Sequence, residues 1–320
     1  MSIGRRAALL LAGTTLAAPA FAQAAWPSRS VRIVIPYAPG GPVEIPGRFI
    51  AEHLTQRLGQ PFVVETRPGA GGAIGTKQII AGNDDHTFLM PTGAVAIQPA
   101  VQPDIGYDPL RELAPVSLVS ESTMAFAVRP NSRLRDLQNL LATARAEPGR
   151  ITYGSSGNGT TTHMAAALFA VRAGIDLQHI PYRGGGQLIN AFLAGDVDIM
   201  SGDLSTILPH ARDGRARLLG VTGPERSPAV PDVPSITEAV PGTGLNIWFA
   251  LFAHRGISPD IVRRLVDAMA PLRETSSLAQ RMVANGGRLL VTGPDELAAL
   301  LARELPMWRQ VVAQAGIKPE

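Results

Sequence analysis

The sequence contains no cysteine. This absence excludes disulfide bonds, thiolate metal sites, a cysteine nucleophile and a lipid-modified cysteine behind an export signal. An excess of charge of one sign is also missing, because the chain has 29 basic and 26 acidic residues. No cluster of Lys or Arg supplies the stripe that would follow the phosphates of a nucleic acid. A nucleic-acid partner is therefore not expected.

The chain begins with an apolar run that is too short to cross a bilayer. The run, at residues 7–20, falls short of the ~20 apolar residues that a transmembrane helix needs. Arg5 and Arg6 precede it and the small-residue sequence AFA at residues 20–22 follows it, which is the pattern of a secretory signal. We predict a signal peptide over residues 1–22 and a soluble, exported mature chain. The choice between general and twin-arginine export stays open.

Motifs for metal, nucleotide and hydrolytic chemistry are incomplete or missing. The six histidines show no metal-ligand spacing. Residues 67–77 are rich in glycine but lack the Gly-Lys-Ser/Thr of a phosphate loop and the third glycine of a dinucleotide fingerprint. Residues 154–158 break the nucleophile-elbow pattern at its last position. We therefore expect no metal, no cofactor and no enzymatic activity.

Length and patterning predict a two-lobed α/β protein. A chain of 320 residues with 45% hydrophobic content exceeds what one core usually supports. Short β-branched runs alternate with segments of helical period, which indicates α/β layers with a largely parallel sheet. The C-terminal helices have no strands of their own, so we expect the chain to cross between lobes near residues 122–128 and 242–250. The predicted lobes are residues 23–124 with 245–320, and residues 125–244. A hinge pair of this kind commonly encloses a small ligand.

Two glycine-containing loops follow predicted strands and precede predicted helices. They are residues 37–44 (YAPGGPVE) and residues 155–163 (SSGNGTTTH). Backbone N–H groups and the positive end of a helix dipole at such junctions hold an anion well. Each loop also has an explanation that needs no ligand. In residues 155–163, Ser, Asn and Thr can cap the helix, and in residues 37–44, Glu44 can complement the helix dipole.

At these loops and elsewhere, the sequence resembles the Bug family of periplasmic solute receptors of tripartite tricarboxylate transporters. The matching segments run in family order over nearly the whole expected mature chain: IPYAPGG at 35–41, RFIAEHL at 48–54, LGQPFVVE at 58–65, RPGAGG at 67–72, YGSSGNGT at 153–160, IPYRGG at 180–185, VT at 221–222 and PDVPS at 231–235. The resemblance implies a two-lobed periplasmic binding fold, type II-like, that closes on a small carboxylate. It implies membrane transporter subunits as partners and the periplasm as location, and lobe closure needs no second subunit, so we expect a monomer. Carried over by position, the implied ligand-binding residues are Tyr37, Gly40, Gly41, Val43, Glu44, Thr92, Ser156, Asn158, Gly159, Thr160, Thr161 and Asp203.

The chain departs from the family pattern at places that bear on the substrate. Pro42 removes a backbone donor where the family has Ala or Thr, and Glu44 replaces Asp. Gln98 stands in place of the family's Asn, and residues 201–203 read SGD instead of FDN. The identity of the ligand is therefore not predicted.

The sequence favours a non-enzymatic receptor that delivers a small organic anion to a membrane transporter. A sensor that passes the closed complex to a signalling kinase is an alternative, and a periplasmic hydrolase is a weaker one. We expect the anion to be held mainly by backbone N–H groups and hydroxyls of the two loops. Gly159→Val is then expected to abolish binding while leaving the fold intact, and Glu44→Gln to change ligand preference more than stability.

Overall fold

The computed structural model describes residues 26–273 and 277–319. The expected signal peptide, residues 1–22, lies outside the described residues. The strands are β1 Val31–Ile35, β2 Phe62–Thr66, β3 Thr87–Leu89, β4 Leu113–Val128, β5 Thr152–Ser155, β6 Gln178–Pro181, β7 Ile199–Asp203, β8 Arg217–Val221, β9 Asn246–His254 and β10 Gly287–Leu289. The α-helices are α1 Glu44–Leu58, α2 Ala73–Ala81, α3 Ala94–Val101, α4 Pro109–Glu112, α5 Leu137–Ala146, α6 Thr161–Ala173, α7 Gly185–Ala194, α8 Leu204–Arg212, α9 Pro259–Met269, α10 Ser277–Val283 and α11 Pro294–Gln314.

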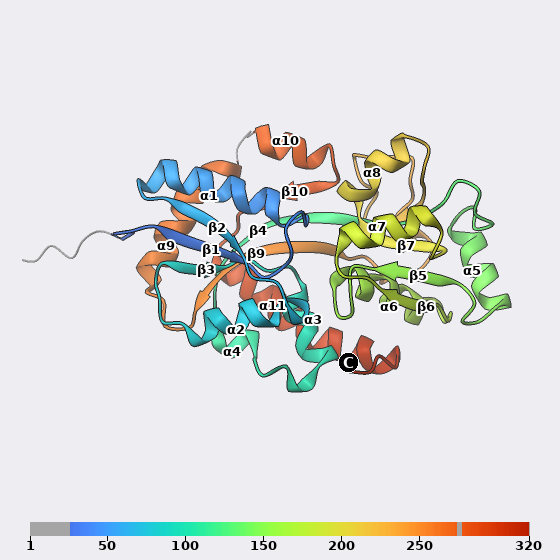
Figure 1. Cartoon of the computed structure of the whole chain (residues 1–320), viewed down its shortest axis with the longest axis horizontal. Helices are drawn as coiled ribbons and strands as arrows, with labels where there is room; N and C mark the ends of the chain where they lie inside the picture. Colours follow the sequence, from blue (N-terminus) through green and yellow to red (C-terminus); the bar gives the residue numbers. More distant parts are fainter. Residues whose placement is uncertain (1–25, 274–276, 320) are drawn as a thin grey trace, which may run out of the picture.

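The molecule has two α/β lobes that share one long strand (Figure 1). In lobe 1, β1 pairs in parallel with β2 and β3. In lobe 2, β5 pairs in parallel with β6 and β7. The two-lobed fold expected from the sequence is confirmed.

Strands β4 and β9 join the lobes. β4 pairs with β9 along its first part, from Leu113 to Thr123, and with β7 and β8 from Met124 onward. The pairings of β4 and β9 are antiparallel, because one strand leaves lobe 1 and the other returns to it. The expectation of a largely parallel sheet therefore holds only for the strands away from these two connections. The lobe boundaries themselves stay a prediction.

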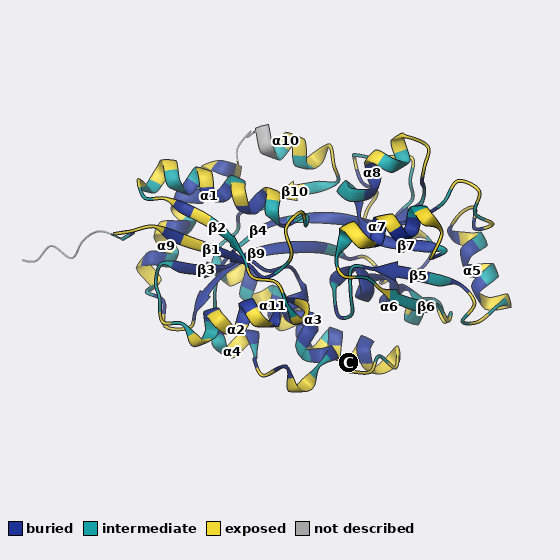
Figure 2. Cartoon of the chain, in the orientation of Figure 1, coloured by how far each residue is buried: buried dark blue, intermediate teal, exposed yellow. Residues whose placement is uncertain are grey.

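Each lobe has its own hydrophobic core. In lobe 1, α1 packs with α9, whereas α11 packs against α3 and β4. Lobe 2 has one apolar cluster under α5 and α6 and another under α7 and α8, on opposite faces of its sheet. The central strands β1, β3, β4, β7 and β9 are mostly buried, the edge strands β2, β6 and β10 are partly exposed, and the outer helices expose one face (Figure 2). The sheets are thus rigid platforms that present the loops at the ends of their strands.

Short polar and glycine signals set the ends of the helices that matter for the site. Thr160 caps α6 by accepting a hydrogen bond from the backbone of His163, and α6 ends at Gly174 with a φ of 61°. α1 ends in the same way at Gly59, whose φ is 75°. The left-handed conformation at these two positions favours glycine.

Candidate ligand-binding cleft

A cleft of about 530 Å³ lies between the two lobes. From lobe 1 it is lined by the loop between β1 and α1, by Thr92 after β3, and by Ile247. From lobe 2 it is lined by residues that follow β5, β6 and β7 and begin α6, α7 and α8. The carboxyl ends of parallel strands from both lobes therefore face one cavity, which is the usual place for a ligand in open α/β sheets.

Four helices begin at or beside this cleft. They start at Glu44 (α1), Thr161 (α6), Gly185 (α7) and Leu204 (α8). The N-terminus of a helix carries roughly half a positive charge and N–H groups without intrahelical partners. Converging helix starts make the cavity favourable to an anion without a cluster of basic side chains.

The loop before α1 is hydrogen-bonded to Glu44, the first residue of that helix. Gly40, whose φ is 84°, donates its N–H to Glu44 Oε2 at 2.8 Å. Arg48 pairs with the same carboxylate, its Nε lying 2.7 Å from Oε1. The Gly40 hydrogen bond and the Arg48 guanidinium lower the pKa of Glu44. Glu44 does not line the cleft, whereas Gly41 and Val43 do, and their N–H groups have no hydrogen-bond partner among the described residues.

The loop before α6 uses most of its N–H groups internally. Ser156 N donates to Thr162 Oγ1 at 3.0 Å, and Gly157 N donates to Ser155 Oγ at 3.2 Å. Gly159 N donates to His163 Nδ1 at 3.1 Å. The N–H groups of Gly157, Gly159 and Thr160 thus have protein partners, whereas that of Asn158 has none among the described residues; their contact with an anion stays a prediction.

The start of α6 supplies hydrogen-bond donors without a protein partner in lobe 2. Thr161 lines the cleft with 2% of its surface exposed, and its hydroxyl has no hydrogen-bond partner among the described residues. The N–H groups of Thr161 and Thr162 are in the first turn of α6, where a helix offers no acceptor. A buried hydroxyl without a partner costs free energy, so this position favours a bound ligand or water.

One acidic and one basic side chain belong to the described lining. Asp203 is 5% exposed and caps α8, its Oδ1 accepting from Ser205 N at 2.9 Å. Burial raises the pKa of Asp203, although hydrogen bonds from Ser205 and the Ser122 hydroxyl oppose that shift. Arg183 is exposed at the rim. The lining thus has no pair of buried arginines to hold an anion.

Tyr37 and Thr92 form a fixed polar edge in lobe 1. The Tyr37 hydroxyl lies 2.9 Å from Thr92 Oγ1 and accepts from Thr92 N at 3.1 Å. Burial raises the pKa of Tyr37, so the phenol stays protonated at neutral pH. Tyr37 can therefore offer a hydrogen bond to an acceptor in the cleft.

Most of the residues carried over from the family resemblance line this cavity. Nine of the twelve do so: Tyr37, Gly40, Gly41, Val43, Thr92, Ser156, Thr160, Thr161 and Asp203. Glu44, Asn158 and Gly159 are not part of the lining. Contact of any of the twelve with a ligand stays a prediction.

Gly159 faces away from the cleft. A Cβ at this position would lie 2.7 Å from Gln98 Nε2, and its φ is 65°. A branched side chain at 159 would therefore disturb packing in addition to any effect on binding. This corrects the expectation that Gly159→Val leaves the fold intact.

Glycines 184–186 at the start of α7 line the cleft but were absent from the expected set. Their sequence signal is the one that marked the other two loops, a glycine run between a strand and a helix. Thr162 and Arg183 were missed as well.

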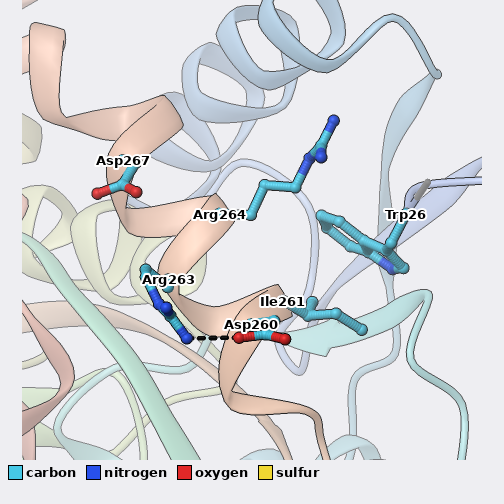
Figure 3. A pocket seen from close by; sticks show the side chains of 6 residues that line it. All are labelled: Trp26, Asp260, Ile261, Arg263, Arg264 and Asp267. Carbon is cyan, nitrogen blue, oxygen red and sulfur yellow. Dashed lines mark hydrogen bonds and ion pairs between the residues drawn. The ribbon is translucent and has the colours of Figure 1, made fainter.

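A second hollow, of about 380 Å³, lies on lobe 1 between Trp26 and α9. Figure 3 shows its charged side chains, among which Arg263 is paired with Asp260. This hollow is lined by the side of α9 and not by the carboxyl ends of parallel strands. The converging helix starts that favour an anion in the cleft are therefore not part of its described lining.

Within residues 26–273 and 277–319, no group of three or more His, Asp or Glu side chains could hold a metal ion. Among the same residues, no helix combines the length and the apolar character needed to span a bilayer.

Two α/β lobes around an anion-favouring cleft define a solute-binding protein. The chain belongs to the tripartite tricarboxylate transporter family receptors (TctC), whose pattern matches residues 47–317. It is therefore a solute-binding receptor of the periplasmic type, and the resemblance to Bug proteins is confirmed.

Known relatives match nearly the whole chain. Protein BugT of Bordetella pertussis is 30% identical over 314 residues, covering 97% of this chain and 96% of BugT. An R. palustris protein solved with adipate is 29% identical, with a TM-score of 0.85 and coverage of 92% of this chain and 100% of that one. MatC from Rhodopseudomonas palustris, solved with bound malate, is 28% identical, with a TM-score of 0.81 and coverage of 89% and 99%.

Proposed function

We propose that this receptor captures a small organic carboxylate in the cleft, without changing it chemically, and delivers it to the membrane subunits of a tripartite tricarboxylate transporter. We further propose that it acts as a monomer, exported with the signal peptide at residues 1–22. The observation that carries the proposal is the set of open donors at two facing helix starts. These donors are the N–H groups of Gly41 and Val43 in lobe 1 and the hydroxyl and N–H of Thr161 in lobe 2.

A carboxylate fits this set of donors for electrostatic reasons. Hydrogen bonds to an ionised acceptor are shorter and stronger than those between neutral groups. The dipoles of α1 and α6 add to them because their positive ends point at the same cavity. A neutral amide of the same shape would gain little from either effect. The adipate and malate bound by the two R. palustris relatives support the same class of ligand.

The size of the cavity favours a small ligand. A volume of about 530 Å³ lies within the ~300–1,000 Å³ range of small-molecule pockets. If one carboxylate of the ligand lies between the starts of α1 and α6, the rest of the ligand extends toward Asp203 and the start of α7. These groups are the candidates for distinguishing one carboxylate from another.

A thermal-shift screen of the mature chain tests the ligand class. Mono-, di- and tricarboxylates are each compared with their own amides. A ligand at 100 times its Kd stabilises the folded state by ~2.7 kcal/mol, which raises Tm visibly. We expect shifts with acids and none with amides. Equal shifts for an acid and its amide would contradict carboxylate binding.

Uptake measurements test the delivery step. Cells that lack this chain are expected to lose uptake of the carboxylate identified in the screen, and re-expression of the chain restores it. Undiminished uptake, together with loss of a transcriptional response to the same carboxylate, would point to the sensor alternative.

A further inference from the structure

Gln98 connects the two lobes beside the loop between β5 and α6, residues 156–160, which is called the binding loop below. It lies on α3, which packs in lobe 1, and 2% of its surface is exposed. Its side-chain Nε2 donates to the backbone oxygens of Asn158 and Gly159, each at 3.3 Å. Both acceptors belong to the loop between β5 and α6 in lobe 2. The amide is therefore a buried polar bridge between the lobes, and it is not part of the cleft lining.

Two glycines leave the space that this amide occupies. A Cβ on Gly71, in lobe 1, would lie 2.1 Å from Gln98 Nε2, and a Cβ on Gly159, in lobe 2, would lie 2.7 Å from it. Both glycines have left-handed backbones, with φ of 60° and 65°. Backbone from both lobes therefore packs directly on the same side chain, and a residue with a Cβ at either position would displace it.

The contacted loop leads straight to the ligand-facing start of α6. Thr160 follows Gly159 and caps α6, and its hydroxyl donates to Gly157 O at 2.7 Å. Thr161, with its open hydroxyl, is the next residue. Fixing the oxygens of Asn158 and Gly159 therefore fixes the position of the helix start that faces the cleft.

We infer that Gln98 is a positioning residue: it ties α3 to the binding loop of lobe 2 and so sets both the arrangement of the lobes and the affinity for ligand. The affinity part rests on the proposed function. The arrangement part does not, because the bridge exists between protein groups alone. Without the amide, the oxygens of Asn158 and Gly159 lose this donor, the second of them in a buried position, and the lobes lose a specific contact near the site.

The arrangement part is tested in the mature chain without ligand. The sequence has no cysteine, so Gln56→Cys on α1 and Arg145→Cys on α5 provide the only two positions for spin labels. Both residues are exposed, one on each lobe. Distance distributions between the labels are measured by electron–electron double resonance. Gln98→Met removes the donor at similar volume and is expected to broaden the distribution.

Matched variants separate this effect from general damage. Gln102→Met makes the same change four residues along the chain, where no side-chain hydrogen bond is present among the described residues, and should leave the distribution unchanged. Gly71→Ala displaces the Gln98 amide from the lobe 1 side and should broaden the distribution even if Gln98→Met fails to fold. Circular dichroism establishes that each variant compared is folded.

Affinity is measured on the same variants with adipate and malate as probes. Gln98→Met is expected to weaken binding about tenfold relative to wild type and to Gln102→Met. The inference is overturned if Gln98→Met and Gly71→Ala both fold and give the same distance distribution as Gln102→Met. If neither probe, nor any acid of the thermal-shift screen, binds the wild type, the proposed function fails and the distances alone decide the role of Gln98.

Discussion

His163 and His179 stack face to face beside the loop between β5 and α6, with ring centroids 3.8 Å apart and an interplanar angle of 4°. His163 Nδ1 accepts the N–H of Gly159, and His179 Nε2 lies 2.7 Å from Ser155 Oγ. The two rings therefore fix both ends of the loop that leads to α6. Because the rings are parallel and in contact, a charge on one ring disfavours a charge on the other.

This stack predicts a loss of stability in acid. Burial, and then the neighbouring His179, lower the pKa of His163 to about 3, and burial lowers the pKa of His179 to about 4. The unfolded chain titrates its histidines near ~6.5, so between these values the unfolded state binds more protons than the folded one. The free energy of unfolding should therefore be unaffected above pH 7 and fall as the pH drops from about 6.5 toward 4.

The variant His179→Phe checks this prediction, because it keeps a ring in the stack and removes one titrating group. Urea unfolding at pH 8 and pH 4.5 gives the acid-induced loss for each protein. The loss should be smaller in the variant, whatever the variant costs at pH 8. An equal loss in both proteins would show that other groups carry the acid sensitivity.

Thr161→Val should separate binding from stability. The substitution keeps the shape of the side chain and removes a buried hydroxyl that has no partner among the described residues. Stability should be unchanged or slightly increased, since no hydrogen bond to a described residue is lost. Carboxylate affinity should fall by roughly 10- to 100-fold, because the variant loses the binding free energy of one hydrogen bond to a charged group.

Titration calorimetry and a thermal melt on the same preparation provide both numbers. Thr143→Val is the control, because the Thr143 hydroxyl donates to Asn139 O on α5, away from the cleft. That control should lose some stability and keep its affinity. Unaltered affinity in Thr161→Val would remove Thr161 from the site.

Glu44→Gln should affect stability rather than ligand ranking. The Glu44 carboxylate accepts from Gly40 N and pairs with Arg48, and it does not line the cleft. This position favours the helix-dipole alternative over a role at the rim of the site. We expect a loss of ~0.3–1 kcal/mol with relative affinities unchanged. A changed order among acids of different charge would restore the role in ligand preference.

The sequence alone predicts the lobes and the two glycine-containing loops, because local periodicity and strand-to-helix junctions are visible along the chain. Pairing between distant segments is not visible in this way. Gln98 stood out only as a departure from the family pattern, and its contact with Gly159 depends on how the two lobes meet. For the same reason the sequence does not reveal that a Cβ at Gly159 would meet the side chain of Gln98, so that Gly159→Val also disturbs packing.

The charge of Asp203 should determine how a second carboxylate is received. Asp203 is buried in the cleft wall and caps α8, and burial raises its pKa. When ionised, it repels a negative group that extends from the starts of α1 and α6 into the rest of the cavity. Asp203→Asn keeps an amide oxygen for the cap and removes the charge, so the fold should be retained. The affinity for adipate should then rise relative to the affinity for its monomethyl ester, by several-fold at neutral pH.

Asp136→Asn, which alters the equivalent cap of α5 outside the cleft lining, should leave that ratio unchanged. Calorimetric titration of both ligands into the three proteins gives the ratios, and an unchanged ratio in Asp203→Asn would show that Asp203 acts only as a helix cap.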